Sequence, residues 1–283
     1  MTHTHNTIAH MLHWTIISCI LTVGVVQGMQ LFASALVLNR KPATGIAVAA
    51  KSRQVHPAAS DTVPSFECAI DPFGRVPNWG GMQSAAQLNR AYASIAPQEY
   101  VPPPAYDIRE LTTPLSSLNQ GPRDAETVRL ITGKLLFSTR FMGRFDLDDG
   151  EWTGTHPGID FKMPPGTPIR AIAGGRVHAI EYQPEGLGKY VVIEHRLPAT
   201  GERIFSIYGH MDAITARTGD EVQPGDDIGT VGQTGIVTLP HLHLQIDRDD
   251  GSEPHLPYVP LATTPRSEVM KRMINPIDVI ERY

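Results

Sequence analysis

The sequence has few cysteines and no marked excess of charge of either sign. Cys19 and Cys68 are its only cysteines in 283 residues, which excludes a disulfide-stapled fold. The 24 basic and 29 acidic residues give a formal net charge of -5, so no surface for nucleic acid is expected. Hydrophobic residues make up 41% of the chain, which excludes a wholly disordered protein. The 25 glycines and 24 prolines favour short strands and turns over a helical bundle.

Charged side chains are absent from the first 39 residues. The apolar run from Trp14 to Leu38 is long enough to cross a bilayer, which takes ~20 residues. Its small residues from Ala33 to Ala35 are typical of a signal-peptidase site, so we expect residues 1–38 to be a signal peptide or a membrane anchor. Basic residues follow the run rather than precede it, and such a flank tends to stay cytoplasmic. We nevertheless expect export to the periplasm or cell envelope, with cleavage after Ala35 or anchoring through residues 14–38.

Proline is frequent between Pro42 and Pro122, with eleven prolines in 81 residues. This composition indicates that residues 39–125 are a spacer with islands of order, and it predicts no role for them. Within the spacer, the positions of Leu88, Tyr92 and Ile95 predict a short packed helix over residues 84–95. The aromatic island at residues 66–81 is expected to dock on the domain that follows rather than to bind a ligand.

From residue 126 onward, short β-like stretches alternate with glycine, proline and aspartate. Residues 191–195 and 203–208, joined by a polar loop, predict an antiparallel hairpin. Further strands are expected at residues 167–172, 175–180, 227–231 and 241–247. Ser267 is expected to cap a helix through Ile274, and Asn275-Pro276 to begin a second helix. We therefore expect residues 126–283 to form a mainly β domain with C-terminal helices.

Three histidine motifs lie inside this β region, namely HPGID at residues 156–160, YGH at 208–210 and HLH at 241–243. Residues i and i+2 of a strand point to the same face. His241 and His243 can therefore both bind one metal ion, or one can bind it while the other reaches the substrate. An isolated pair of this kind is weak evidence, because most such histidines are packed or exposed.

His156 and Asp160 flank Pro157-Gly158, where glycine permits unusual dihedrals, so both side chains can bend toward a common centre. Catalytic zinc takes three protein ligands and leaves a fourth position for water. His156, Asp160 and one of the HLH histidines would supply these three ligands. Taken alone, Asp160 would be a turn residue that caps backbone amides, and His210 an exposed histidine at a hairpin end.

Together, these motifs resemble those of the lysostaphin-type (LytM-type) zinc metallopeptidases, which cut peptide bonds in bacterial peptidoglycan. The resemblance covers about residues 154–247, with the motifs in the same order and at similar separations. It implies an antiparallel β-sheet groove, one Zn²⁺ ion per chain and a peptidoglycan peptide as substrate. It further implies that His156, Asp160 and His243 bind the metal and that His210 and His241 are the catalytic histidines.

The sequence contains no HExxH motif, so no glutamate occupies the usual position of a metalloprotease general base. An imidazole must then transfer the proton and stabilise the oxyanion, and His210 and His241 are the candidates. Among the other histidines, we expect His178 and His195 to be packed or at the rim of the cleft, and His255 to be exposed.

Two functions of other classes are compatible with parts of the sequence. The same fold serves as a noncatalytic regulator of cell-wall hydrolases when it lacks the metal ligands, but this chain keeps every ligand type. The stretch at residues 218–232 resembles lipoyl or biotinyl carrier modules, which need an acceptor lysine at a hairpin tip. No lysine lies between Lys189 and Lys271, so the carrier function is disfavoured.

The segment before residue 126 is also a candidate for autoinhibition. It contains His56, Asp61, Glu67 and Cys68, any of which could occupy the open position on a zinc ion. On this hypothesis, deletion of residues 36–120 would raise the activity.

Overall fold

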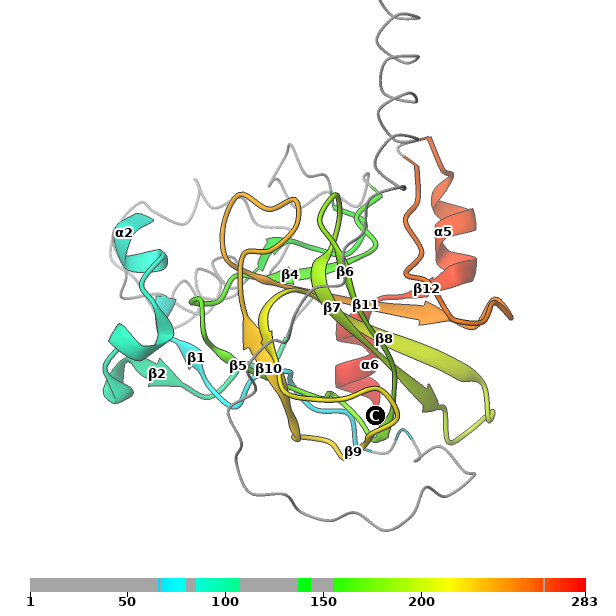
Figure 1. Ribbon diagram of the computed structural model, residues 1–283, viewed down its shortest axis with the longest axis horizontal. Helices are drawn as coiled ribbons and strands as arrows, with labels where there is room; N and C mark the ends of the chain where they lie inside the picture. Colours follow the sequence, from blue (N-terminus) through cyan, green and yellow to red (C-terminus); the bar gives the residue numbers. More distant parts are fainter. Residues whose placement is uncertain (1–65, 67, 80–84, 107–136, 144–154, 262) are drawn as a thin grey trace, which may run out of the picture. The chain divides into compact units, whose positions relative to one another are not determined.

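The computed structural model in Figure 1 describes residues 66, 68–79, 85–106, 137–143, 155–261 and 263–283. All of them belong to one compact unit that spans residues 58–283. The expected signal or anchor at residues 1–38 lies outside the described residues. Among the helices of the described ranges, none has the length and apolar character that a membrane span needs.

A large antiparallel sheet forms the centre of the fold. Its strands are β3 (Phe137–Thr139), β4 (Gly158–Phe161), β5 (Pro168–Arg170), β6 (Gly175–Gln183), β7 (Gly188–Arg196), β8 (Arg203–Ile214), β9 (Glu221–Val222), β10 (Asp227–Val231), β11 (Leu242–Arg248) and β12 (Met273–Ile274). The main path runs β3, β4, β11, β8, β7, β6 and β9, with β11 between β4 and β8 (Figure 1). Strand β10 pairs with β5 and β8, and β12 pairs with β11. Every pair is antiparallel, so the predicted mainly β fold is confirmed.

Strands β7 and β8 form the predicted hairpin. At one end of the hairpin Arg196 pairs with Arg203, and at the other end Lys189 pairs with Met211. Val191 and Ile193 of β7 pack in the main core, whereas Val192 packs in a smaller cluster on the other face. This alternation follows from the two-residue period of a strand, and it shows that this part of the sheet is covered on both faces.

Part of the proline-rich segment is built into the same domain, and we call the described residues between 66 and 106 the arm. It contains β1 (Val76–Pro77), α2 (Ala85–Leu88), the 3-10 turns η3 (Tyr92–Ser94) and η4 (Pro97–Glu99), and β2 (Tyr100–Val101). The bonds from Ile70 N to Ile172 O and from Arg170 N to Pro72 O, both 2.8 Å, join it to the sheet domain. Its side chains Phe73 and Trp79 are buried in the main core, as the docking interpretation predicts.

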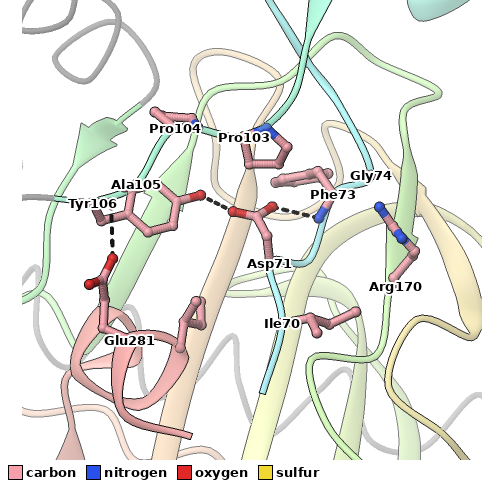
Figure 2. Close-up of a pocket in the computed structure, with 11 residues that line it drawn as sticks. Ile70, Asp71, Phe73, Gly74, Pro103, Pro104, Ala105, Tyr106, Arg170 and Glu281 are labelled. Carbon is pink, nitrogen blue, oxygen red and sulfur yellow. Dashed lines mark hydrogen bonds between the residues drawn. The ribbon is translucent and has the colours of Figure 1, made fainter. Parts of the chain in front are cut away.

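A pocket of about 420 Å³ lies where the arm meets the sheet domain (Figure 2). On its wall, the Asp71 carboxylate accepts hydrogen bonds from the Tyr106 hydroxyl and from Phe73 N, the latter at 2.8 Å. Burial raises the pKa of Asp71 to about 6, although these bonds and the nearby Arg170 act in the opposite direction. The residues that line this pocket include none of the five predicted site residues, so it belongs to the attachment of the arm.

The helix predicted over residues 84–95 is wrong in extent, because α2 ends at Leu88 and η3 is a separate 3-10 turn. Tertiary bonds hold this part of the chain out of a continuous helix. Tyr92 N donates to Pro165 O at 3.0 Å, and the Arg90 guanidinium pairs with Glu99 at 2.8 Å. Such contacts outweigh a weak intrinsic helical preference.

The second C-terminal helix is confirmed and the first is shorter than predicted. Asn275 caps α6 (Pro276–Arg282), because its side chain accepts a hydrogen bond from Ile277 N at 3.2 Å. The preceding α5 (Arg266–Arg272) begins after Pro265, so the prediction that Ser267 is its cap is wrong. Residues 273–274 leave the helix to form β12, where pairing with β11 buries Met273.

Candidate active site

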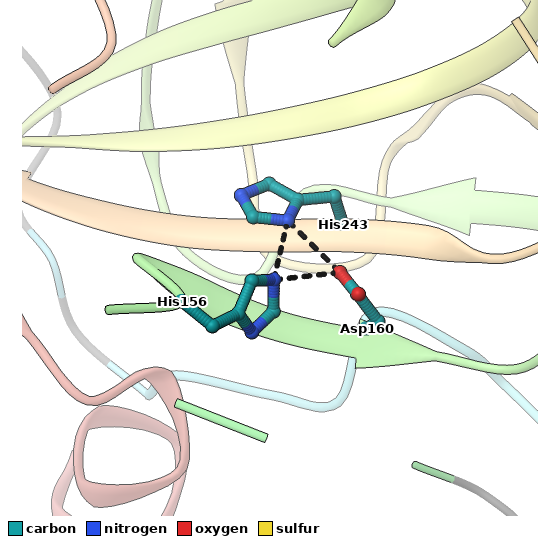
Figure 3. A group of neighbouring side chains, drawn as sticks. All are labelled: His156, Asp160 and His243. Atoms are coloured by element: carbon teal, nitrogen blue, oxygen red, sulfur yellow. Dashed lines mark hydrogen bonds and ion pairs between the residues drawn. The ribbon is translucent and has the colours of Figure 1, made fainter. Parts of the chain in front are cut away.

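Strands β4 and β11 bring His156, Asp160 and His243 together (Figure 3). Asp160 lies in β4 directly opposite His243 in β11, and His156 lies just before β4. The Asp160 Oδ1 atom is 3.0 Å from His156 Nε2 and 2.9 Å from His243 Nδ1. The two imidazole nitrogens are 3.1 Å apart. Three possible metal ligands therefore converge on one point, and all three side chains are buried.

Gly158 permits the close approach of the two strands. A Cβ atom at this position would lie 2.3 Å from Leu244 O and 3.0 Å from His243 Cε1. No side chain fits in that space, because real Cβ atoms do not approach a backbone oxygen so closely. The glycine of the HPGID motif is thus needed for the packing of β4 on β11 rather than for a turn.

Hydrogen bonds on the outer side of His156 and His243 fix the tautomer of both rings when they are neutral. His156 Nδ1 lies 2.9 Å from the carbonyl oxygen of Arg140, which can only accept, so Nδ1 is the donor. His243 Nε2 donates to Gln245 Oε1 at 3.1 Å. In neutral rings the nitrogens that face Asp160 then carry lone pairs. Two lone pairs and a carboxylate oxygen at this distance repel one another unless a proton or a metal cation lies among them. Burial lowers the pKa of His243, but Asp160 and Gln245 outweigh it and raise that pKa, so a proton can occupy this place when no metal ion is bound.

The donor set suits a zinc ion. Histidine nitrogen and carboxylate oxygen are ordinary zinc ligands, and three of them leave a position open in a catalytic site. Ligands at ~2.0–2.1 Å in a tetrahedron lie about 3.3 Å apart, close to the 2.9 to 3.1 Å between these atoms. Burial alone would raise the pKa of Asp160, but His156, His241 and His243 hold it well below its usual range. Asp160 is therefore an anion and supplies negative charge for a bound cation.

His210 and His241 lie beside these three residues. The register of β8 against β7 shifts between Tyr208 and Met211, and His210 has a φ of 60° at this bulge. A bulge redirects a side chain, and here the His210 ring centroid is 4.6 Å from that of His241 and 6.0 Å from that of His243. His241 Nε2 is 3.6 Å from Asp160 Oδ1. All five predicted residues therefore lie in one place.

The loop between β10 and β11 orients both of these additional imidazoles. His210 Nδ1 donates to Thr234 O at 2.8 Å, and His241 Nδ1 donates to Leu239 O at 2.7 Å. In the neutral rings, Nε2 is then the nitrogen that can accept a proton. Burial, together with His241 and His243, lowers the pKa of His210 to about 3, so this ring is neutral at pH 7.

The sequence predictions missed the groups that orient these rings. Three of them are the backbone carbonyls of Arg140, Thr234 and Leu239, which no side-chain motif can reveal. The fourth is Gln245, which bonds to His243. Strand periodicity could have predicted that Gln245 lies beside His243, because residues 243 and 245 share one face of β11.

Among the histidines that the structure describes, His178, His195 and His255 are not part of this group. His195 is fully buried and lies 2.7 Å from Gly174 O and from Ser206 Oγ, so it is packed, as predicted. The prediction that His255 is exposed is wrong, because only 2% of it is accessible. Its ring stacks on Phe205, with ring centroids 4.0 Å apart, and its Nε2 donates to Asp247 at 3.1 Å.

The residues considered for autoinhibition are only partly described. Cys68 is exposed and does not belong to the group of possible metal ligands. His56, Asp61 and Glu67 lie outside the described residues. The autoinhibition hypothesis therefore stays a prediction.

Residues 154–255 match Peptidase family M23. This segment is an M23 peptidase domain. The predicted membership of the lysostaphin-type family is thereby confirmed, and the five site residues all lie within the M23 domain.

Curated relatives match about a third of this chain over a small part of their own length. The chain is 38% identical over 90 residues to an uncharacterized metalloprotease of Haemophilus influenzae, 40% over 91 residues to the peptidoglycan DD-endopeptidase ShyA of Vibrio cholerae, and 36% over 97 residues to the glycyl-glycine endopeptidase ALE-1 of Staphylococcus capitis. Each match covers 32% of this chain and 18%, 20% and 24% of the respective relative. The chain thus spans about a fifth of the length of the curated relatives it matches.

Two solved structures each match less than half of this chain. The LytU structure is 35% identical, with 40% of this chain and 73% of that chain covered and a TM-score of 0.34. The catalytic domain of lysostaphin from Staphylococcus simulans is 26% identical, with 45% of this chain and 80% of that chain covered and a TM-score of 0.35.

Proposed function

We propose that the protein is a zinc-dependent endopeptidase that hydrolyses peptide bonds in peptidoglycan stem peptides or cross-bridges. The observation that carries this proposal is the convergence of His156, Asp160 and His243 next to two further imidazoles. The substrate class is supported by the M23 domain and by two relatives that are named as a peptidoglycan DD-endopeptidase and a glycyl-glycine endopeptidase.

His156, Asp160 and His243 would hold the metal ion. When bound, zinc would polarise a peptide carbonyl as a Lewis acid and would make a water molecule in the site more acidic. One carboxylate and two neutral imidazoles neutralise only part of the charge of a Zn²⁺ ion. The loaded site would therefore keep a net positive charge, which favours a strong Lewis acid. The lone pairs of His156 Nε2 and His243 Nδ1 in the neutral rings, together with the anionic Asp160, thus suit that ion.

His210 and His241 would transfer the proton. Each ring has its Nδ1–H engaged by a backbone carbonyl, so its Nε2 can accept a proton from the attacking water. The same ring can then return the proton to the leaving amine, or donate a hydrogen bond to the oxyanion while it is charged. His210 is neutral at pH 7, so it enters the cycle as an acceptor.

We further propose that the enzyme acts outside the cytoplasm, in the periplasm or cell envelope. Residues 1–38 would direct export and would either be removed after Ala35 or stay as an anchor. Residues 126–283, completed by the arm, would form the peptidase domain, and the rest of residues 39–125 would act as a spacer. Peptidoglycan lies outside the membrane, so export and the proposed substrate agree.

Digestion of purified sacculi by the full-length protein, followed by mass analysis of the released fragments, tests this function. We expect the wild type to release peptide fragments and a chelator to stop the release. His243→Ala should lose both zinc and cleavage, whereas His210→Ala should keep zinc and lose cleavage by about 10²- to 10⁴-fold. His178→Gln is the control, because it changes a histidine outside the five, and it should cleave normally.

Three results would contradict the proposal. These are chelator-resistant cleavage, full activity in His243→Ala or His210→Ala, and a zinc-loaded wild type that releases nothing. The last result would favour the noncatalytic regulator instead.

A further inference from the structure

A chain of buried polar side chains continues from His243 along β11 and beyond it. Gln245 and Asp247 are fully buried, and His255 is 2% exposed. None of these three residues belongs to the five predicted site residues. Polar groups are costly to bury, so their contacts must be satisfied inside the domain.

The two-residue period of β11 places His243, Gln245 and Asp247 on the same face. Gln245 Oε1 is 3.1 Å from His243 Nε2, and Gln245 Nε2 donates to Asp247 Oδ1 at 2.8 Å. The same amide nitrogen donates to Tyr258 O at 2.9 Å. The Gln245 amide thus lies between a metal-ligand histidine on one side and two oxygen atoms on the other.

The two oxygen atoms fix the direction of the Gln245 amide. A carboxylate and a backbone carbonyl can only accept hydrogen bonds, so the NH₂ group of Gln245 must face Asp247 and Tyr258. Its Oε1 must then face His243, which requires a proton on His243 Nε2. In a flipped Gln245 amide, the NH₂ group would face His243 Nε2. Its Oε1 would then face Asp247 Oδ1 and Tyr258 O, which are also acceptors and would repel it.

Asp247 is itself held in place by donors from the segment after β11. Its Oδ2 accepts from Tyr258 N at 2.8 Å and from His255 Nε2 at 3.1 Å. The His255 ring is stacked flat on Phe205, with 1° between the ring planes. Asp247 therefore has a fixed orientation and offers its other oxygen to Gln245.

We propose that Gln245 and Asp247 are positioning residues that set the tautomer of His243 for metal binding. Asp247 orients the Gln245 amide, Gln245 keeps the proton of the neutral His243 ring on Nε2, and the lone pair of Nδ1 then faces His156 and Asp160. This inference rests on the proposed function, in which His243 binds zinc. His255 and Tyr258 complete the arrangement by orienting Asp247. Outer hydrogen bonds of this kind commonly change metal affinity by 10- to 100-fold.

Nitrogen NMR of the histidine rings in the zinc-loaded wild type tests the tautomer directly. We expect His243 to bind through Nδ1 and to show a slowly exchanging Nε2–H. His243 bound through Nε2 would overturn the inference. This measurement needs no variant, so it decides the matter even if the substitutions below prevent folding.

Zinc affinity, measured by competition with a chromophoric chelator, tests the two positioning residues. Gln245→Leu removes the acceptor of the His243 proton and should weaken zinc binding by about 10- to 100-fold, with faster exchange of the Nε2–H. Asp247→Asn should also weaken it, because one asparagine oxygen cannot face both Gln245 and the donors of Tyr258 and His255. In the Gln245→Leu background Asp247→Asn should have much less effect, because the two residues act in series.

Ser206→Ala is the matched control. Ser206 is also fully buried in the sheet, on β8, and it lies 2.7 Å from the ring of a histidine that is not a proposed ligand, His195. The Ser206→Ala substitution should lower the stability of the protein without changing its zinc affinity. Unchanged zinc affinity in folded Gln245→Leu and Asp247→Asn, with zinc-dependent cleavage in the wild type, would overturn the positioning role alone. A wild type that binds no zinc would overturn the proposed function as well.

Discussion

His195 shows how burial controls the charge of a histidine in this sheet. The ring is fully buried between Gly174 O and Ser206 Oγ. Burial lowers the pKa of His195 to about 4, and the hydrogen bond to Gly174 opposes this effect only in part. The folded protein therefore keeps this ring neutral at a pH where the unfolded chain has already bound a proton.

A pH-dependent loss of stability follows from this difference. The unfolded histidine has a pKa near ~6.5, so between pH 6.5 and pH 4 only the unfolded state takes up the proton. The free energy of unfolding should fall as the pH falls through this range, by about 1.4 kcal/mol per pH unit for this residue. Above pH 6.5 His195 should contribute no pH dependence.

Urea unfolding of the metal-free protein at pH 7.5 and pH 4.5 measures this effect. His195→Gln is the comparison, because glutamine can bond to both neighbours but does not titrate. The wild type should lose about 2 to 3 kcal/mol more than the variant between the two pH values. Equal losses would show that His195 takes up a proton in the folded state.

Individual residue roles are only partly predictable from the sequence. The strand pattern around His195 is sufficient to predict that it is packed, because its neighbours alternate with the period of a strand. The burial of His255 is not predictable, because it depends on Phe205 and on Asp247, which come from other positions of the sheet. The prolines at positions 254, 257 and 260 around His255 led to the wrong expectation that it is exposed.

At the scale of elements, the site depends on the contact between β4 and β11. His243 pairs with Asp160, and Gly158 pairs with Gln245 in the same register. The contact is tight at Gly158, where an added Cβ would meet Leu244 O at 2.3 Å. A change in this spacing should therefore move Asp160 relative to His243.

Gly158→Ala tests this dependence. The methyl group should force the two strands apart, lower the stability by about 1 to 3 kcal/mol and weaken zinc binding by at least tenfold. Gly201→Ala is the control, because that glycine has a φ of 68° and no atom within 4 Å of an added Cβ. It should cost about 1 kcal/mol through backbone strain and leave zinc affinity unchanged. Zinc titration and thermal unfolding of both variants would measure the effects, and normal zinc affinity in Gly158→Ala would contradict this account.

Most strands could be predicted from their alternating β-branched residues, whereas features that depend on a partner strand could not. The β7–β8 hairpin follows from its own sequence. The bulge at His210 and the change from α5 to β12 depend on contacts with β7 and β11. The five site residues were grouped by resemblance of their motifs, because strand periodicity alone relates only His241 to His243.

At the scale of the whole molecule, the arm is a structural part of the peptidase domain. Phe73 packs edge to face on Phe161, which follows Asp160 in β4, with ring centroids 5.7 Å apart. Phe66, Val76 and Trp79 are also buried in the main core. Each large side chain removed from a core costs about 3 to 5 kcal/mol, whereas the whole stability of a domain is only about 5 to 15 kcal/mol.

A chain that starts at residue 107 should therefore fail to unfold cooperatively, whereas a chain that starts at residue 58 should keep the melting temperature of the full protein. Thermal unfolding followed by circular dichroism compares the two. A stable chain from residue 107 would contradict the structural role of the arm. The deletion of residues 36–120 would remove the same core side chains, so it is unsuitable as a test of autoinhibition.

The most direct test of the central claim is the zinc content of the purified full-length protein after loading and desalting, measured by mass spectrometry beside His243→Ala. We predict one zinc ion per wild-type chain and less than a tenth of that in the variant. A zinc-free wild type, or equal zinc in both proteins, would contradict the claim that His156, Asp160 and His243 form a metal site.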